Sequence, residues 1–161
     1  MDDKILVHKV HGICKITEEL VISGEDFLKA SAIDNTSLVI YCPKNKKDLF
    51  FRDVVSFDEA NKILDYMKNL KGTKIEPTKK QRTELYEKLY NGNLYDLAYL
   101  NIALLRYQVL KSKKKQGLSA IETKVLKAAN LMLTEELSLS LNKSIDELNV
   151  LIKEWANQYG E

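Results

Sequence analysis

The sequence lacks the features of membrane-spanning and disulfide-stabilised proteins. No apolar run approaches the ~20 residues that a helix needs to cross a bilayer. The only two cysteines, Cys14 and Cys42, are too few for a disulfide framework, so we expect two reduced thiols. The start, Met1-Asp2-Asp3-Lys4 before a short apolar run, does not have the shape of a secretory signal. We therefore expect a cytoplasmic protein with no membrane partner.

Motifs for catalysis and cofactor binding are also missing. The sequence has no P-loop, no dinucleotide-binding fingerprint and no nucleophile elbow. His8 and His11 form an H-x-x-H pair, but on a strand this spacing directs the two rings to opposite faces of the sheet. A surface or turn role is favoured over a metal site, which needs more ligands. We expect no catalytic residues, no metal and no cofactor.

The first 55 residues have the pattern of a small sheet. The chain has 161 residues, 45% of them hydrophobic and 30% charged, which suits one or two globular domains. Apolar and β-branched clusters alternate with turn signals such as His11-Gly12 and Ser23-Gly24. The expected strands are Ile5–Val10, Ile13–Thr17, Leu20–Ile22, Phe27–Ile33 and Leu38–Cys42. This spacing predicts a small barrel or strongly bent sheet with an exposed edge strand.

The rest of the sequence has a helical period. Three capping boxes begin at Ser56, Ser119 and Ser144, each with a glutamate three residues later. Gly72 ends the first helix, and residues 72–77 form a short linker. We expect four further helices, over residues 78–90, from 93 to about 111, from 119 to 141, and from 144 onward. The prediction is an α+β protein with a β domain that carries one helix (residues 1–72) and an all-helical domain (residues 73–161).

Charge is unevenly distributed along the chain. The net charge is only +2, but residues 76–127 have 11 basic and 5 acidic side chains, whereas residues 128–161 have 2 and 6. A basic middle third is typical of a surface that meets phosphate backbone, and a solvated lysine-rich helix face is the alternative. The candidate residues, which cannot all face one way, are Lys79, Lys80, Arg82, Lys88, Arg106, Lys111, Lys113, Lys114, Lys115 and Lys124.

Two stretches resemble a known family. The first is His8-Lys9-Val10-His11-Gly12-Ile13, followed by Ile22-Ser23-Gly24, Cys42-Pro43 and Phe51-Arg52-Asp53-Val54-Val55-Ser56. It resembles the polymerase-interacting domain of the CarD/CdnL transcription regulators of bacteria, which the transcription-repair coupling factor shares. The second, Gln116-Gly117-Leu118-Ser119-Ala120-Ile121-Glu122 with Leu126-Lys127-Ala128-Ala129, resembles a helix start in the same family's C-terminal domain.

The resemblance implies a mechanism without covalent chemistry. A Tudor-like β domain would dock on the RNA polymerase β subunit, and the helical domain would contact promoter DNA at the upstream edge of the transcription bubble. The DNA contacts would go to the backbone with little sequence specificity and would modulate open-complex stability. Separately from the resemblance, we expect a monomer rather than an oligomer. The candidate polymerase-binding residues are Leu20, Ile22, Leu38, Ile40, Tyr41, Pro43 and Arg52.

The sequence departs from the family at two places. Leu20 and Tyr41 stand where family members often have arginines, which makes the expected polymerase contact more apolar. Family members also insert a tryptophan into the minor groove, but Lys79 and Lys80 occupy the matching region and Trp155 is far along the chain. These departures motivate one alternative, an interaction module that docks on a protein without productive DNA contact. A separate alternative is an enzyme of unrecognised type, for which the sequence shows no site.

Overall fold

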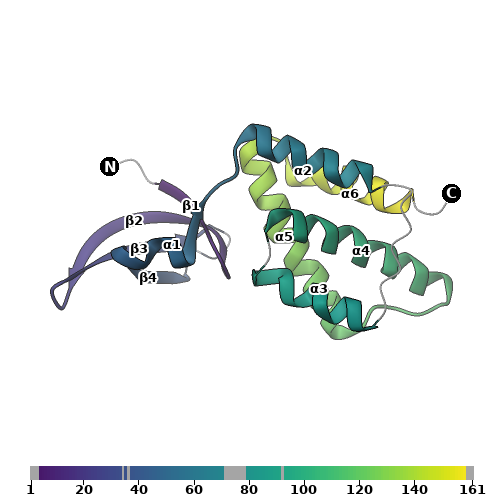
Figure 1. Ribbon diagram of the computed structural model, residues 1–161, viewed down its shortest axis with the longest axis horizontal. Helices are drawn as coiled ribbons and strands as arrows, with labels where there is room; N and C mark the ends of the chain where they lie inside the picture. Colours follow the sequence, from purple (N-terminus) through teal and green to yellow (C-terminus); the bar gives the residue numbers. More distant parts are fainter. Residues whose placement is uncertain (1–3, 34, 36, 71–78, 92, 159–161) are drawn as a thin grey trace. The chain divides into compact units, whose positions relative to one another are not determined.

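The chain divides into two compact units, Met1–Val55 and Ser56–Glu161. Figure 1 shows a computed structural model, which describes residues 4–33, 35, 37–70, 79–91 and 93–158. The first unit is a β-sheet and the second is helical, which confirms the α+β class. The expected linker at residues 72–77 lies outside the described residues.

The β unit is an open antiparallel sheet of five strands in the order β4-β3-β2-β1-β5. The strands are β1 (Lys4–His8), β2 (Gly12–Ile22), β3 (Glu25–Ala32), β4 (Val39–Pro43) and β5 (Phe51–Asp53). A short 3-10 turn (Lys44–Lys46) and α1 (Lys47–Phe50) connect β4 to β5. Among the described strands β4 and β5 form the two edges, so the predicted edge position of residues 38–42 is confirmed.

One long curved strand, β2, replaces the two strands expected over residues 13–22 (Figure 1). The adjacent charges Glu18 and Glu19 interrupt the hydrophobic pattern, but both side chains are exposed and the backbone pairing with β3 continues through them. A register shift between Ile16 and Glu18 absorbs one extra residue as a bulge. The hairpin then turns at Ser23 and Gly24, both with positive φ, as a two-residue turn requires.

The core of the β unit contains both cysteines as free thiols, as expected. Cys14 and Cys42 are buried with Leu6, Ala30 and Phe51. Cys14 lies on β2 and Cys42 on β4, and β3 runs between those strands. Strands two places apart are separated by about 9.5 Å, which is too far for a disulfide between side chains on one face. Burial raises the pKa of the Cys42 thiol and so disfavours its reactive thiolate form.

The helical unit comprises five helices packed around α4. They are α2 (Phe57–Asn69), α3 (Lys79–Asn91), α4 (Leu94–Lys113), α5 (Ala120–Leu141) and α6 (Ile145–Asn157). The side chains of Ser56, Asn93, Ser119 and Ser144 each accept a hydrogen bond from the amide three residues later, which begins α2, α4, α5 and α6. No helix in the described part of the chain is both long and apolar enough to span a bilayer.

The first of these helices, α2, packs with the helical unit. Its buried residues Ala60, Ile63 and Met67 share one face, and the helix contacts α4, α5 and α6. The boundary between the two compact units therefore falls after Val55 in the sequence. The sequence analysis instead grouped this helix with the β domain. The capping box at Ser56 located the helix, but its partners lie far along the chain.

Arg106 connects three helices inside this unit. Only 1% of the residue is exposed. Its Nη2 donates to the backbone carbonyls of Leu70 (2.6 Å) and Trp155 (3.3 Å), and its Nε donates to that of Ala156 (3.2 Å). These carbonyls belong to the C-terminal ends of α2 and α6, where helix carbonyls have no partner within the helix and a cation is favoured.

We predict that Arg106→Met lowers the free energy of unfolding by about 3 kcal/mol, because it leaves buried carbonyls without a donor. Lys113→Met is the matched control, since Lys113 is exposed and its loss should change stability by less than about 0.5 kcal/mol. Urea unfolding of the two variants measures the difference. Equal stabilities would show that Arg106 does not hold the helices together.

Candidate protein and nucleic-acid interfaces

The edge strand β4 presents two different faces. Ile40 pairs with Ala30 on β3 and packs against the core of the β unit, as does Leu38 just before the strand. Val39 and Tyr41 point the other way and are 41% and 52% exposed. Leu38 and Ile40, both candidate contact residues, therefore pack into the core. Of the three candidates Leu38, Ile40 and Tyr41, it is Tyr41 that faces solvent.

Cross-strand pairing brings three candidate residues onto that outer face. Leu20 is opposite Phe27, which is opposite Pro43, so the three side chains form a row across β2, β3 and β4. In the neighbouring row, Lys29 lies between Glu18 and Tyr41. We call Leu20, Phe27, Pro43 and Tyr41 the outer-face patch.

Two other candidates lie outside this patch. Ile22 ends β2 beside the hairpin turn, two residues after Leu20 and on the same face, and is 39% exposed. Arg52 is an exposed residue of β5, at the edge opposite β4, where its Nη1 donates to the Asp53 carbonyl. Phe27 was missed in the sequence because its side chain becomes part of the patch only through the register of three strands.

In the helical unit, the carboxylate of Glu122 on α5 gathers side chains from two other helices, α3 and α4. Its oxygens lie 3.3 Å from Arg82 Nε on α3, 3.5 Å from Lys111 Nζ on α4 and 3.4 Å from the Tyr86 hydroxyl, which donates to it. The Tyr107 ring lies beneath both cations, 4.2 Å from the Arg82 guanidinium carbon and 5.0 Å from Lys111 Nζ. We call these residues the Glu122 network.

The local sequence fixes the position of this carboxylate. Glu122 forms a complete capping box with Ser119: its Oε1 accepts from the Ser119 amide at 2.8 Å, and its own amide donates to the Ser119 hydroxyl. Burial raises the pKa of Glu122, but the hydrogen bonds with Ser119 and the charges of Lys111 and Arg82 outweigh it, so the pKa lies below its usual value. Burial and the Glu122 charge raise the pKa of Tyr86 to about 12.

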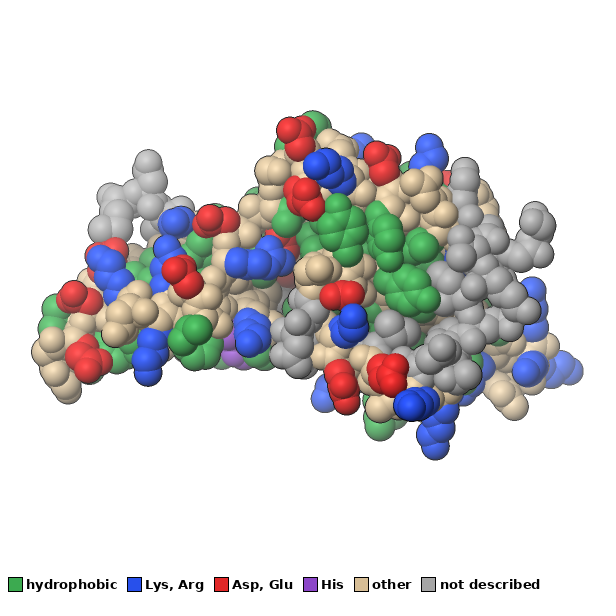
Figure 2. Space-filling view, viewed as in Figure 1, with side chains coloured by type: hydrophobic (Ala, Val, Ile, Leu, Met, Phe, Trp, Pro, Cys, Tyr) green, Lys and Arg blue, Asp and Glu red, His purple; other side chains and the backbone are tan. Residues whose placement is uncertain are grey.

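The network places two groups of exposed lysines at one end of the helical unit. The start of α3 and the end of α4 lie together there (Figure 1), with Arg82 and Lys111 joined through Glu122. Lys79 and Lys80 precede Arg82 by about one turn, and Lys113–Lys115 follow Lys111. Figure 2 shows Lys and Arg side chains gathered along this end of the unit. We call the exposed lysines Lys79, Lys80 and Lys113–Lys115 the basic margin.

The remaining basic candidates have different surroundings. Lys88 Nζ lies 3.4 Å from Asp96, and Lys124 is exposed on the first turns of α5. Arg106 is buried and donates to backbone carbonyls, so it is not part of the exposed basic surface. A count of basic residues could not separate these cases, because burial depends on packing between distant helices.

The two histidines lie together, contrary to the expectation of opposite faces. β1 ends at His8, so His11 belongs to the turn and not to the strand, and the ring centroids are 4.8 Å apart. His8 Nδ1 accepts from the amides of Val10 and His11, which gives it a role in the turn. Burial, followed by the neighbouring His11, lowers the pKa of His8. The described residues contain no group of three or more side chains that could hold a metal ion.

The β unit has an open sheet edge with a partly exposed apolar patch, and the helical unit has exposed lysines at one end. These features suit a protein that binds other macromolecules. Residues 62–153, more than half of the chain, match the family described as CarD, C-terminal domain. The chain therefore belongs to the CarD family, whose members are non-enzymatic transcription factors that interact with RNA polymerase. No curated protein matches the chain.

We predict that Glu122→Gln lowers stability most at neutral pH. Because the folded pKa of Glu122 is depressed, its stabilising contribution is present above the ordinary value of 4.5 and is lost as the pH falls through the folded value. The difference in urea midpoint between wild type and Glu122→Gln should shrink in buffers below pH 4.5. Glu84→Gln, an exposed control on α3, should behave as wild type. If the difference in urea midpoint persisted at low pH, the ionised carboxylate of Glu122 could not be the cause of that difference.

Proposed function

We propose that this protein docks on the β subunit of bacterial RNA polymerase through β4 and the outer-face patch, and that its helical unit contacts promoter DNA near the upstream edge of the bubble. Membership of the CarD family supports a transcriptional role with polymerase as partner. The observation that carries the docking proposal is the edge position of β4 beside exposed apolar side chains. A partner strand can add to such an edge, while side-chain contacts provide specificity.

The DNA contact would come from the exposed lysines. Lys79, Lys80 and Lys113–Lys115 are exposed, and none of these side chains has an ion-pair partner among the described residues. Lysine binds phosphate as a point charge, without reading sequence. It cannot replace the stacking lost at an opened base step, as an inserted aromatic ring does. The effect on open complexes would therefore be modest and would weaken as salt screens the phosphate contacts.

We predict that Tyr41→Asp prevents binding of the polymerase β subunit in a pull-down, because a charge at the centre of an apolar contact costs about 2 kcal/mol or more. Val10→Asp is the matched control: Val10 is 47% exposed against 52% for Tyr41, but it lies in the β1–β2 turn. Circular dichroism confirms folding of both variants. Normal binding by Tyr41→Asp would reject this face as the docking surface.

We predict that the Lys113/Lys114/Lys115 triple alanine variant weakens DNA binding about equally on all sequences. The slope of log affinity against log salt should flatten by roughly one unit per lost phosphate contact. A triple alanine variant of Lys62, Lys68 and Lys143 removes the same charge from exposed positions elsewhere in the unit and should keep the slope. An unchanged slope in the first variant would favour an interaction module without productive DNA contact.

A further inference from the structure

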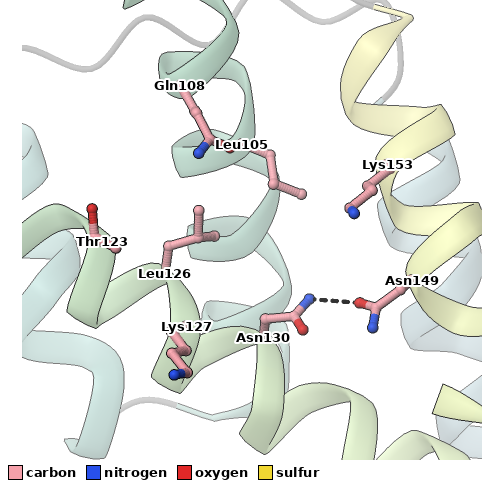
Figure 3. Close-up of a pocket in the computed structure, with 8 residues that line it drawn as sticks. All are labelled: Leu105, Gln108, Thr123, Leu126, Lys127, Asn130, Asn149 and Lys153. Carbon is pink, nitrogen blue, oxygen red and sulfur yellow. Dashed lines mark hydrogen bonds between the residues drawn. The ribbon is translucent and has the colours of Figure 1, made fainter. Parts of the chain in front are cut away.

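A groove of about 300 Å³ lies between α4, α5 and α6. Its volume is at the lower end of the range for small-molecule sites. Figure 3 shows side chains from all three helices around it. The lining residues are Leu105, Gln108, Thr123, Leu126, Lys127, Asn130, Asn149 and Lys153.

The hydrogen-bonding groups of the groove form a paired donor and acceptor. Asn130 Nδ2 donates to Asn149 Oδ1 at 2.9 Å. This bond leaves the pair with the acceptor Asn130 Oδ1 and the donor Asn149 Nδ2, which lie on the same side of the bond in Figure 3. Adjacent donor and acceptor atoms match the edge of a nucleobase, as asparagine does in pairing with adenine. Leu105 and Leu126 supply apolar contact for a flat ring.

The charge of the groove favours an anion. Two of its lining residues are lysines and none is acidic. Lys153 is one of only two basic residues in the acidic stretch 128–161, yet its side chain points into the groove (Figure 3). Neither Lys127 nor Lys153 forms an ion pair with the described residues. Figure 3 shows the Lys127 ammonium on the α5 side of the groove, far from Lys153, so a phosphate in the groove would meet Lys153 as its cation.

A buried amide lies on the same side of α4. Asn101 is 0% exposed, and neither its Oδ1 nor its Nδ2 has a hydrogen-bond partner among the described residues. Buried polar groups are normally paired, and one without a partner calls for an explanation. Asn101 precedes Leu105 by four residues and Gln108 by seven, so it continues the groove-lining side of α4 toward the core. The Asn101 amide is thus a polar group in the core on the side of α4 that lines the groove.

We propose that this groove binds a nucleoside monophosphate, or a phosphorylated heterocycle of that size. The phosphate pairs with Lys153, the base edge bonds to the Asn130–Asn149 pair, and the ring packs on the two leucines. The site is distinct from the outer-face patch and from the exposed lysines of α3 and the α4–α5 connection.

Calorimetric titration of the full chain with AMP, GMP, CMP and UMP tests the proposal. At least one nucleotide should bind saturably, and Lys153→Ala should weaken it by roughly tenfold or more, as expected for a lost charge-assisted bond. Asn149→Asp keeps the size of the side chain and an acceptor for Asn130, but it adds a negative charge and should abolish binding. Lys143→Ala, an exposed lysine in the α5–α6 turn, should bind as wild type.

Three results would overturn the proposal. The first is the absence of binding by all four nucleotides. The second is binding of inorganic phosphate as tight as that of the nucleotide, which would mean adventitious anion binding. The third is nucleotide binding that survives Lys153→Ala and Asn149→Asp but is lost in the Lys113/Lys114/Lys115 variant, because the nucleotide would then occupy the basic margin.

Discussion

The arrangement of charge in the helical unit depends on one nearly buried carboxylate. Glu122 is held by its own N-cap, Ser119, through a contact only three residues apart in the chain that sets the carboxylate at the start of α5. A charge in such a place needs partners, because burial without them is costly. Arg82 and Lys111 provide them from α3 and α4. A local capping interaction thus determines where two other helices place their cations.

Basic residues of this unit consequently have three different physical roles. Arg82 and Lys111 share the single negative charge of Glu122, and Arg106 bonds to carbonyls at the ends of two helices. Only residues such as Lys113–Lys115 present their charge to solvent. An approaching polyanion meets this last group directly, while the other two maintain the packing beneath it. For this reason the net positive charge of residues 76–127 is larger than the charge that these residues present at the surface.

Local rules predicted the helices well and the surfaces less well. The starts of α5 and α6 follow from serine and glutamate three residues apart, because a capping box is complete within four residues. β2 was divided at Glu18-Glu19, since exposed charges break the hydrophobic pattern without breaking the backbone ladder. The three-residue β5 carries too little pattern to be detected and exists through its pairing with β1.

The candidate sites show the same limit. Alternation along β4 separates Ile40 from Tyr41, but it does not say which face is covered, because the core beneath Ile40 comes from other strands. The family resemblance supplied candidates on both faces, and register reduced them to one patch. The groove between α4, α5 and α6 had no sequence signal at all, since its lining residues come from three helices and its asparagines and lysines from two of them.

Polar residues at the interface of α4, α5 and α6 add a constraint that packing does not explain. Asn101 lacks a hydrogen-bond partner among the described residues, and Asn130 bonds to Asn149 where apolar side chains would pack without that requirement. Unsatisfied buried amides reduce stability, and apolar replacements of similar shape are often neutral or stabilising. A purely structural helix interface therefore favours leucine at such positions. A groove that must recognise a polar ligand favours the amides, even at the expense of stability, as binding sites commonly do.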